Sequence, residues 1–218
     1  MNDTNNSEKI KKDQPNKPIV SSVIIALAIV FVGFLLVWNN TLTTRKKIDS
    51  NAGQGLSAVD KINNIKPIES NDHIRGDVNA LVKIIEFSDT ECPFCKNFHQ
   101  TLKQILSEYN GQVAWVYRHF PIDSLHSKAR KESEATECAA EQGGNEMFWV
   151  YLDRVFEITP SNNQLDPEKL DEIAKEIKLN DEQFKMCRES GKYAGKVSLN
   201  VADGMNIGIS GTPYSVVI

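Results

Sequence analysis

Two cysteines separated by two residues, Cys92-Pro93-Phe94-Cys95, are the residues of this chain best suited to chemistry. An apolar, β-branched run from Leu81 to Phe87 precedes them and predicts a buried strand. Apolar residues at helical spacing follow them: Phe98, Leu102, Ile105, Leu106 and Tyr109. The two thiols therefore lie on the first turn of a helix, where they can close a small disulfide ring.

The start of this helix favours a thiolate at Cys92. Unpaired backbone N–H groups and the positive end of the helix dipole lower the pKa of a thiol placed there. We expect Cys92 to be an exposed nucleophile, and we expect Cys95, which is less exposed, to resolve the mixed disulfide. A pair of this kind performs dithiol–disulfide exchange.

A Cys-x-x-Cys pair can also be half of a structural zinc site, which needs two further ligands at suitable spacing. The remaining cysteines, Cys138 and Cys187, stand alone in helical sequence. The four histidines form no paired pattern: His73, His99, His119 and His126. We therefore expect neither a metal nor another cofactor. We expect His119 and His126 to lie at the surface or to cap the turn at Pro121.

The segment Glu86-Phe87-Ser88-Asp89-Thr90-Glu91-Cys92-Pro93-Phe94-Cys95 resembles the active-site segment of DsbA-like thiol:disulfide oxidoreductases, which belong to the thioredoxin superfamily. The resemblance continues through Tyr117–Pro121 and Ala135–Gly143 and ends at Gly208–Pro213. It covers about the last two-thirds of the chain. The resemblance implies an α/β protein with a thioredoxin fold and a helical domain inserted between the two halves of that fold.

The pattern of expected elements agrees with the implied fold. Strands are expected at Leu81–Phe87, at Val113–Arg118 and from about Tyr214. Between the last two, helices are expected at Ala129–Gln142, at Asn145–Ile158, after Asp166-Pro167, after Asn180 and at Lys192–Met205. We place the DsbA-like domain at residues 77–218 and its helical insertion at about 123–206. The family pattern continues beyond the last strand, so we expect its C-terminal strand and helix to be missing and the sheet to have an open edge.

The resemblance also implies roles for residues outside the cysteine pair. Glu86 has apolar neighbours and would lie buried beneath the disulfide, where a raised pKa lets it relay a proton to or from Cys95. The alternative is a carboxylate that faces water from an edge strand. Thr212-Pro213 would form a cis-proline loop that faces the disulfide and binds the backbone of a substrate. A trans turn proline is the alternative there.

The other two cysteines, Cys138 and Cys187, both lie in the insertion. They could be ordinary buried cysteines. In an oxidising compartment, an even number of leftover cysteines suggests a structural disulfide. Closing a loop of that length would stabilise the fold by about 4 kcal/mol on the chain-entropy account.

The N-terminal segment Ile19–Trp38 contains twenty residues without a charge. This length spans a bilayer core of roughly 30 Å as a helix. We expect residues 1–18 to form a cytoplasmic tail, residues 19–38 to be a single membrane anchor and residues 39–76 to be an extracytoplasmic tether. A cleaved signal peptide is the alternative, although the apolar run is long and leads into a poor cleavage site.

The formal net charge of −4 gives no basic surface for nucleic acid. We interpret the chain as a membrane-anchored, extracytoplasmic oxidoreductase that introduces disulfides into reduced exported polypeptides. A membrane protein of DsbB-like type would reoxidise it. The alternatives are a reductase or isomerase of the same fold, or a non-catalytic peptide-binding or chaperone module.

Overall fold

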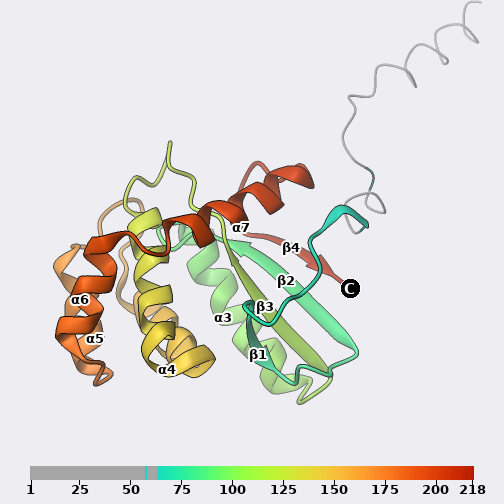
Figure 1. Cartoon of the computed structure of the whole chain (residues 1–218). Helices are drawn as coiled ribbons and strands as arrows, with labels where there is room; N and C mark the ends of the chain where they lie inside the picture. The colour runs from blue at the N-terminus through green and yellow to red at the C-terminus, as the bar shows by residue number, and fades with distance from the viewer. Residues whose placement is uncertain (1–56, 58–62) are drawn as a thin grey trace, which may run out of the picture. The chain divides into compact units, whose positions relative to one another are not determined.

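The structure is a computed structural model that describes residue 57 and residues 63–218 (Figure 1). The expected cytoplasmic tail (1–18), the expected membrane anchor (19–38) and most of the expected tether (39–76) lie outside the described residues. Within the described part of the chain, no helix is long and apolar enough to cross a membrane.

A four-stranded sheet in the order β1-β3-β2-β4 is the centre of the fold. The two middle strands, β2 (Val82–Ser88) and β3 (Val113–His119), run parallel, and helix α3 (Pro93–Glu108) connects them. The outer strands, β1 (His73–Gly76) and β4 (Tyr214–Val217), each pair antiparallel with the neighbouring middle strand. Every residue of β3 is buried, as expected for a parallel strand with both faces covered.

Strand β1 corrects the expected domain boundary. The sequence placed residues 39–76 in a tether, but His73–Gly76 pair with β3 along their whole length. The preceding residues also contact the sheet, because the guanidinium of Arg118 bonds to Asp72 Oδ2 at 2.9 Å and to the carbonyl of Pro67 at 3.1 Å. The folded domain therefore begins before residue 77.

Four helices lie between β3 and β4, namely α4 (Ala129–Ile158), α5 (Glu168–Glu176), α6 (Asp181–Ser190) and α7 (Ala194–Asn206). Helix α4 is interrupted at Gly143 and Gly144, where Gly144 has a φ of 65°. This interruption matches the two helices expected on either side of the glycines. Asn180 caps α6 as predicted, because its Oδ1 accepts a hydrogen bond from Gln183 N at 3.0 Å.

The side chains form three apolar clusters. One face of the sheet packs on α3 and the second half of α4, through Trp115, Tyr117, Phe148, Leu152 and Phe156. The opposite face packs on α7 and the segment after it, through Ile85, Phe87, Val116, Ile207 and Ile209. A third cluster lies within the insertion, where α4, α5 and α6 meet beside the sheet (Figure 1), and contains Cys138, Tyr151, Val155, Ile173 and Phe184.

The second half of α4 belongs to two of these clusters. Phe148 and Leu152 pack toward the sheet, whereas Tyr151 and Val155 pack into the insertion. The two pairs of residues lie on different sides of the helix, so this one helix contributes side chains to both apolar clusters.

Strand β4 lies at the edge of the sheet, as the sequence predicted for the strand near Tyr214. Among the described residues, no strand pairs with its outer side. Val217 and Ile218 are correspondingly exposed.

Candidate active site

The cysteine pair lies at the start of α3, as the sequence predicted. Cys92 is the N-cap residue, with extended backbone angles, and Pro93 occupies the first helical position. Proline fits there because the first helical N–H has no intrahelical partner to lose. Cys95 lies on the first turn, and both cysteines are free thiols.

Cys92 differs from the expectation in one respect, since it is only 5% exposed. Its Sγ lies 3.5 Å from the carbonyl oxygen of Thr212, to which it donates a hydrogen bond. The pKa of Cys92 is lowered to about 6, chiefly because the Cys95 thiol donates a hydrogen bond to its sulfur. Backbone N–H groups of the first turn contribute less, and burial opposes them. The neighbouring thiol, more than the end of the helix, therefore stabilises this thiolate.

Cys95 has the opposite character. It is fully buried, and its Sγ accepts a hydrogen bond from the backbone N–H of Asp89 at 3.4 Å. Burial raises the pKa of the Cys95 thiol, because the charged form is poorly solvated inside the protein. In the reduced pair, Cys92 therefore carries the negative charge and Cys95 keeps its proton.

Glu86 is completely buried, as its apolar neighbours predicted. It lies on β2 opposite Tyr117 of β3. Burial raises the pKa of Glu86 to about 8, and interactions with Ser88 and Trp115 lower it only in part. The carboxyl is therefore mostly protonated at neutral pH and can donate a proton.

Several polar atoms around Glu86 have no hydrogen-bond partner: both carboxyl oxygens of Glu86, Ser88 Oγ, Trp115 Nε1 and the hydroxyl of Tyr117. A buried polar group without a partner costs about 1–3 kcal/mol of stability. Such groups are rare in folded proteins, and each one calls for an explanation such as a catalytic role. This cluster therefore marks the interior beneath the cysteines as a candidate for proton transfer.

The Thr212–Pro213 peptide bond is cis, as the resemblance implied. The loop lies over the cysteine pair, because the Thr212 carbonyl meets the sulfur of Cys92. Phe94, between the two cysteines, is 70% exposed. A polypeptide that approaches this surface therefore meets an apolar side chain and a backbone carbonyl next to the reactive sulfur.

The fold and the site agree with comparisons to known proteins. A family model described as thioredoxin matches residues 69–218, more than half of the chain. The chain belongs to the thioredoxin family. DsbA2 of Pseudomonas aeruginosa is similar in structure, with a TM-score of 0.58 and 28% sequence identity over 70% of this chain and 82% of that chain. BdbD of Bacillus subtilis has a TM-score of 0.62 at 23% identity, over 70% and 84% of the two chains, and this likeness shows the fold alone.

The curated relatives of this thioredoxin domain are much longer proteins. The Na(+)/H(+) antiporter NhaA 3 of Salinispora tropica is 32% identical over 142 residues, which are 65% of this chain and 21% of the antiporter. The antiporter NhaA of Herminiimonas arsenicoxydans is 30% identical over 142 residues, with the same two coverages. The chain thus spans about a fifth of the length of these relatives. Together with the cysteine pair, the family and the structural matches make the described domain an oxidoreductase.

An acidic network that the sequence analysis did not single out anchors the loop before Cys92 of this thioredoxin domain. Glu91 is fully buried, and its carboxylate accepts hydrogen bonds from the backbone N–H groups of Asn163 and Leu165, at 2.8 and 3.2 Å. Asp89, also fully buried, accepts from Ile122 N at 2.8 Å. The two acids, Asp89 and Glu91, stand close to Cys92 in the sequence and could have indicated this network. Their hydrogen-bond partners lie far along the chain, so the sequence alone did not show them.

Glu132 of α4 completes this network. Its carboxyl accepts a hydrogen bond of 2.6 Å from the hydroxyl of Thr90. The pKa of Glu132 is raised to about 9, first by burial and then by its hydrogen bond with Glu91. The proton that Glu132 keeps at neutral pH allows the two carboxyl groups to lie side by side. The loop that carries Cys92 is therefore fixed to the helical insertion.

The two histidines near Pro121 are buried, which corrects the surface positions expected for them. His126 is 7% exposed, and its Nδ1 lies 2.9 Å from Asp89 Oδ2. His119 is 1% exposed, and its Nε2 lies 2.9 Å from Glu137 Oε1. Burial lowers the pKa of His119. Burial alone would raise the pKa of Glu137, but hydrogen bonds from His119 and His73 outweigh it and hold that pKa well below the usual range.

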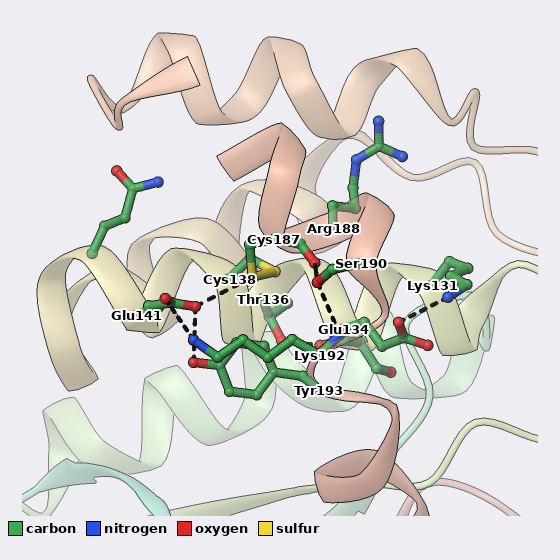
Figure 2. The surroundings of a disulfide bond; sticks show 12 residues. Lys131, Glu134, Thr136, Cys138, Glu141, Cys187, Arg188, Ser190, Lys192 and Tyr193 are labelled. Atoms are coloured by element: carbon green, nitrogen blue, oxygen red, sulfur yellow. Dashed lines mark hydrogen bonds and ion pairs between the residues drawn. A yellow bond between two sulfur atoms is a disulfide. The ribbon is translucent and has the colours of Figure 1, made fainter. Parts of the chain in front are cut away.

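Cys138 and Cys187 form the disulfide that the sequence suggested, with an S–S distance of 2.07 Å and a Cα–Cα distance of 5.8 Å. The bond joins α4 to α6 across the apolar cluster of the insertion. Figure 2 shows Glu141, Lys192 and Tyr193 beside it, where Lys192 Nζ pairs with Glu141 Oε1 at 2.7 Å. This pair lies in a different apolar cluster from Cys92 and Cys95.

Proposed function

We propose that this domain transfers a Cys92–Cys95 disulfide to reduced polypeptides in an extracytoplasmic compartment. The difference between the two thiols carries the proposal. The pKa of Cys92 is lowered to about 6, whereas burial raises the pKa of Cys95. A stable Cys92 thiolate stabilises the reduced pair, and a stable reduced pair makes the oxidised form a good disulfide donor.

The proposed reaction has two thiol-exchange steps. A substrate thiolate attacks Cys92 Sγ of the oxidised pair, a new S–S bond forms, and the electrons of the broken bond leave with Cys95. A second substrate thiolate then attacks the substrate sulfur of the mixed disulfide and releases the Cys92 thiolate. The substrate loses two electrons and gains a disulfide, while the domain gains the electrons as a dithiol.

The cis-proline loop supports a polypeptide as the substrate. The Thr212 carbonyl lies beside Cys92, where the backbone N–H of an extended chain could pair with it. The exposed ring of Phe94 offers an apolar contact next to the reactive sulfur. We propose reduced exported polypeptides as the substrates and a membrane protein of DsbB-like type as the reoxidising partner.

Two features support a location outside the cytoplasm. The uncharged segment Ile19–Trp38 has the length of a membrane anchor. The Cys138–Cys187 disulfide is typical of oxidising compartments. We propose a single-pass membrane protein with a cytoplasmic N-terminus.

Labelling of intact cells tests this location. After mild reduction, a membrane-impermeant maleimide should modify Cys92 in cells that have not been lysed. A Cys92→Ser variant is the control for the labelled position. Labelling that occurs only after lysis would place the domain in the cytoplasm and contradict the proposed location.

A reductase or isomerase of the same fold is the second candidate, and Phe94 is the observation that favours it. Its side chain has no donor for the Cys92 thiolate, so the reduced form lacks one source of stabilisation. The two candidates differ in the reduction potential of the pair. Known potentials run from about −270 mV for thioredoxin, a reductant, to about −120 mV for DsbA, a strong oxidant.

The experiment is equilibration of the protein in glutathione buffers, followed by alkylation and mass spectrometry to assign each cysteine pair. We expect the Cys92–Cys95 couple to lie above about −200 mV, nearer the oxidant end of the range. A potential close to that of thioredoxin would contradict the oxidase and favour the reductase. Assignment by mass keeps the Cys138–Cys187 pair from being mistaken for the reactive couple.

A further inference from the structure

The polar cluster beneath Cys95 contains more than the carboxyl of Glu86. Ser88 follows Glu86 by two residues on β2, so both side chains point to the same face of the sheet. Tyr117 lies opposite Glu86 on β3 and faces the same interior. Glu86, Ser88 and Cys95 are 0% exposed, and Tyr117 is 2% exposed. Four groups able to exchange protons are therefore enclosed together.

The hydroxyl of Ser88 is the neighbour that the other three groups share. It lies close to the carboxyl of Glu86, the thiol of Cys95 and the hydroxyl of Tyr117. Its Oγ is hydrogen-bonded to no described atom in the resting structure, so it is free to pair with any of the three. A serine hydroxyl both donates and accepts hydrogen bonds, so it can receive a proton on one side while it gives one on the other.

We propose that Ser88 relays a proton between the carboxyl of Glu86 and the sulfur of Cys95, an inference that rests on the proposed disulfide exchange. When a substrate thiolate attacks Cys92, Cys95 leaves with the bonding electrons as a thiolate. Ser88 gives its hydroxyl proton to that sulfur and takes the proton of the Glu86 carboxyl. Glu86 is left as a carboxylate and Cys95 as a thiol.

The same path returns the proton when the pair is reoxidised. The Cys92 thiolate attacks a disulfide of the oxidising partner and forms a mixed disulfide with it. Cys95 then gives its proton through Ser88 to the Glu86 carboxylate and attacks Cys92 Sγ. The partner leaves as a thiolate with the bonding electrons, and Glu86 is again neutral.

The surroundings of Cys95 explain why a relay is needed. Its Sγ accepts a hydrogen bond from the backbone N–H of Asp89, which cannot supply a proton. The titratable groups that face Glu86 are Cys92, at the start of α3, and Tyr117, on β3. Cys92 is the sulfur under attack. Tyr117, which also faces Asp89 and Cys95, holds its proton too tightly to compete, because burial raises its pKa well above the usual value.

The test measures the rate at which the oxidised full chain reacts with dithiothreitol, as a function of pH. Ser88→Ala should slow this reaction about tenfold, which is less than the 10²–10⁴-fold contribution typical of general acid–base catalysis, because solvent partly replaces the hydroxyl. It should also shift the Glu86 limb of the pH profile to higher pH, because the Ser88 interaction that lowers the pKa of Glu86 is lost. Ser88→Thr, which keeps a hydroxyl, and Tyr117→Phe, which removes the other hydroxyl, should retain most of the rate.

A double-mutant comparison separates a relay from a packing effect. If Ser88 acts through Glu86, Ser88→Ala should slow the Glu86→Gln variant no further, whereas a packing defect would add to the loss. The wild-type rate should also fall in D₂O, and the fall should be smaller in Glu86→Gln. A Ser88→Ala variant with the wild-type rate and pH profile would overturn the relay alone. A wild-type chain that does not react with dithiothreitol would overturn the proposed function together with the relay.

Discussion

The two cysteine pairs of this chain lie in two different apolar clusters and differ in their polar neighbours. Cys92 and Cys95 are free thiols at the start of α3, with a loop carbonyl above them and unpaired polar groups beneath. Cys138 and Cys187 are separated by 49 positions, are bonded to each other and lie in an apolar cluster. The comparison teaches that the role of a cysteine pair depends on its position in the fold. One position suits disulfide exchange, and the other suits a structural disulfide that holds two helices together.

The largest effect is expected from the reactive pair. Cys92→Ser should abolish disulfide transfer, because it removes the nucleophile. Cys95→Ser should trap mixed disulfides with proteins that carry a disulfide, because the Cys92 thiolate still attacks that disulfide but no Cys95 thiol is left to release the attached protein. Non-reducing gels check this, with a reduced model protein for disulfide transfer and an oxidised one for trapping. A Cys95→Ser variant that turns over normally would show that the two roles are wrongly assigned.

Removal of the other pair should affect stability instead. Replacing Cys138 and Cys187 by Ala should lower the free energy of unfolding by about 4 kcal/mol, from the loss of a long closed loop. Exchange by Cys92 should remain near the wild-type rate. Denaturant unfolding and the dithiothreitol assay on the same protein measure the two quantities. A loss of exchange without a loss of stability would mean that the second pair takes part in electron transfer.

The buried carboxyl of Glu86, beneath the reactive pair, should make the stability of the domain depend on pH, whereas the Cys138–Cys187 pair should not. The pKa of Glu86 rises from 4.5 to about 8 on folding, so the folded state binds the proton more tightly between these two values. The free energy of unfolding should therefore fall with rising pH across this window, by up to about 1.4 kcal/mol per pH unit from this group. Glu86→Gln should flatten the fall, and Cys138→Ala with Cys187→Ala should leave its slope unchanged. Urea unfolding at several pH values measures this, and an unaltered slope in Glu86→Gln would contradict the raised pKa.

The smallest effect is expected at the residue between the reactive cysteines. Phe94→His would add a ring N–H or a positive charge close to the Cys92 thiolate, which should lower the pKa of Cys92. The reduction potential should rise by tens of millivolts, where about 30 mV corresponds to 1.4 kcal/mol. Thiolate absorbance against pH and a glutathione equilibrium check the two quantities. A potential that falls or stays constant would show that this position does not set the redox properties of the pair.

The elements with local signals were predictable from the sequence. The apolar run that forms β2, the helical spacing that forms α3 and the Asn180 cap of α6 each depend on neighbouring residues. The cis bond before Pro213 is absent from such local patterns, and it followed only from the resemblance to a family.

The features that the sequence did not predict depend on contacts between distant segments. Strand β1 has only four residues, and its pairing partner lies about forty positions along the chain. Cys92 is buried because the loop at Thr212 covers it, although the end of a helix favours exposure. Buried His119 likewise pairs with a distant residue, Glu137 of α4. Periodicity within a segment cannot show such contacts.

The second half of α4 determines how the domain should melt. Its residues are shared between the apolar cluster beneath the cysteines and the apolar cluster of the insertion. Neither cluster can be exposed while the other stays intact, because both would lose the same helix. We therefore expect the thioredoxin part and the insertion to unfold in one cooperative transition, with equal calorimetric and van't Hoff enthalpies. The insertion and the sheet would then unfold together, as one cooperative unit.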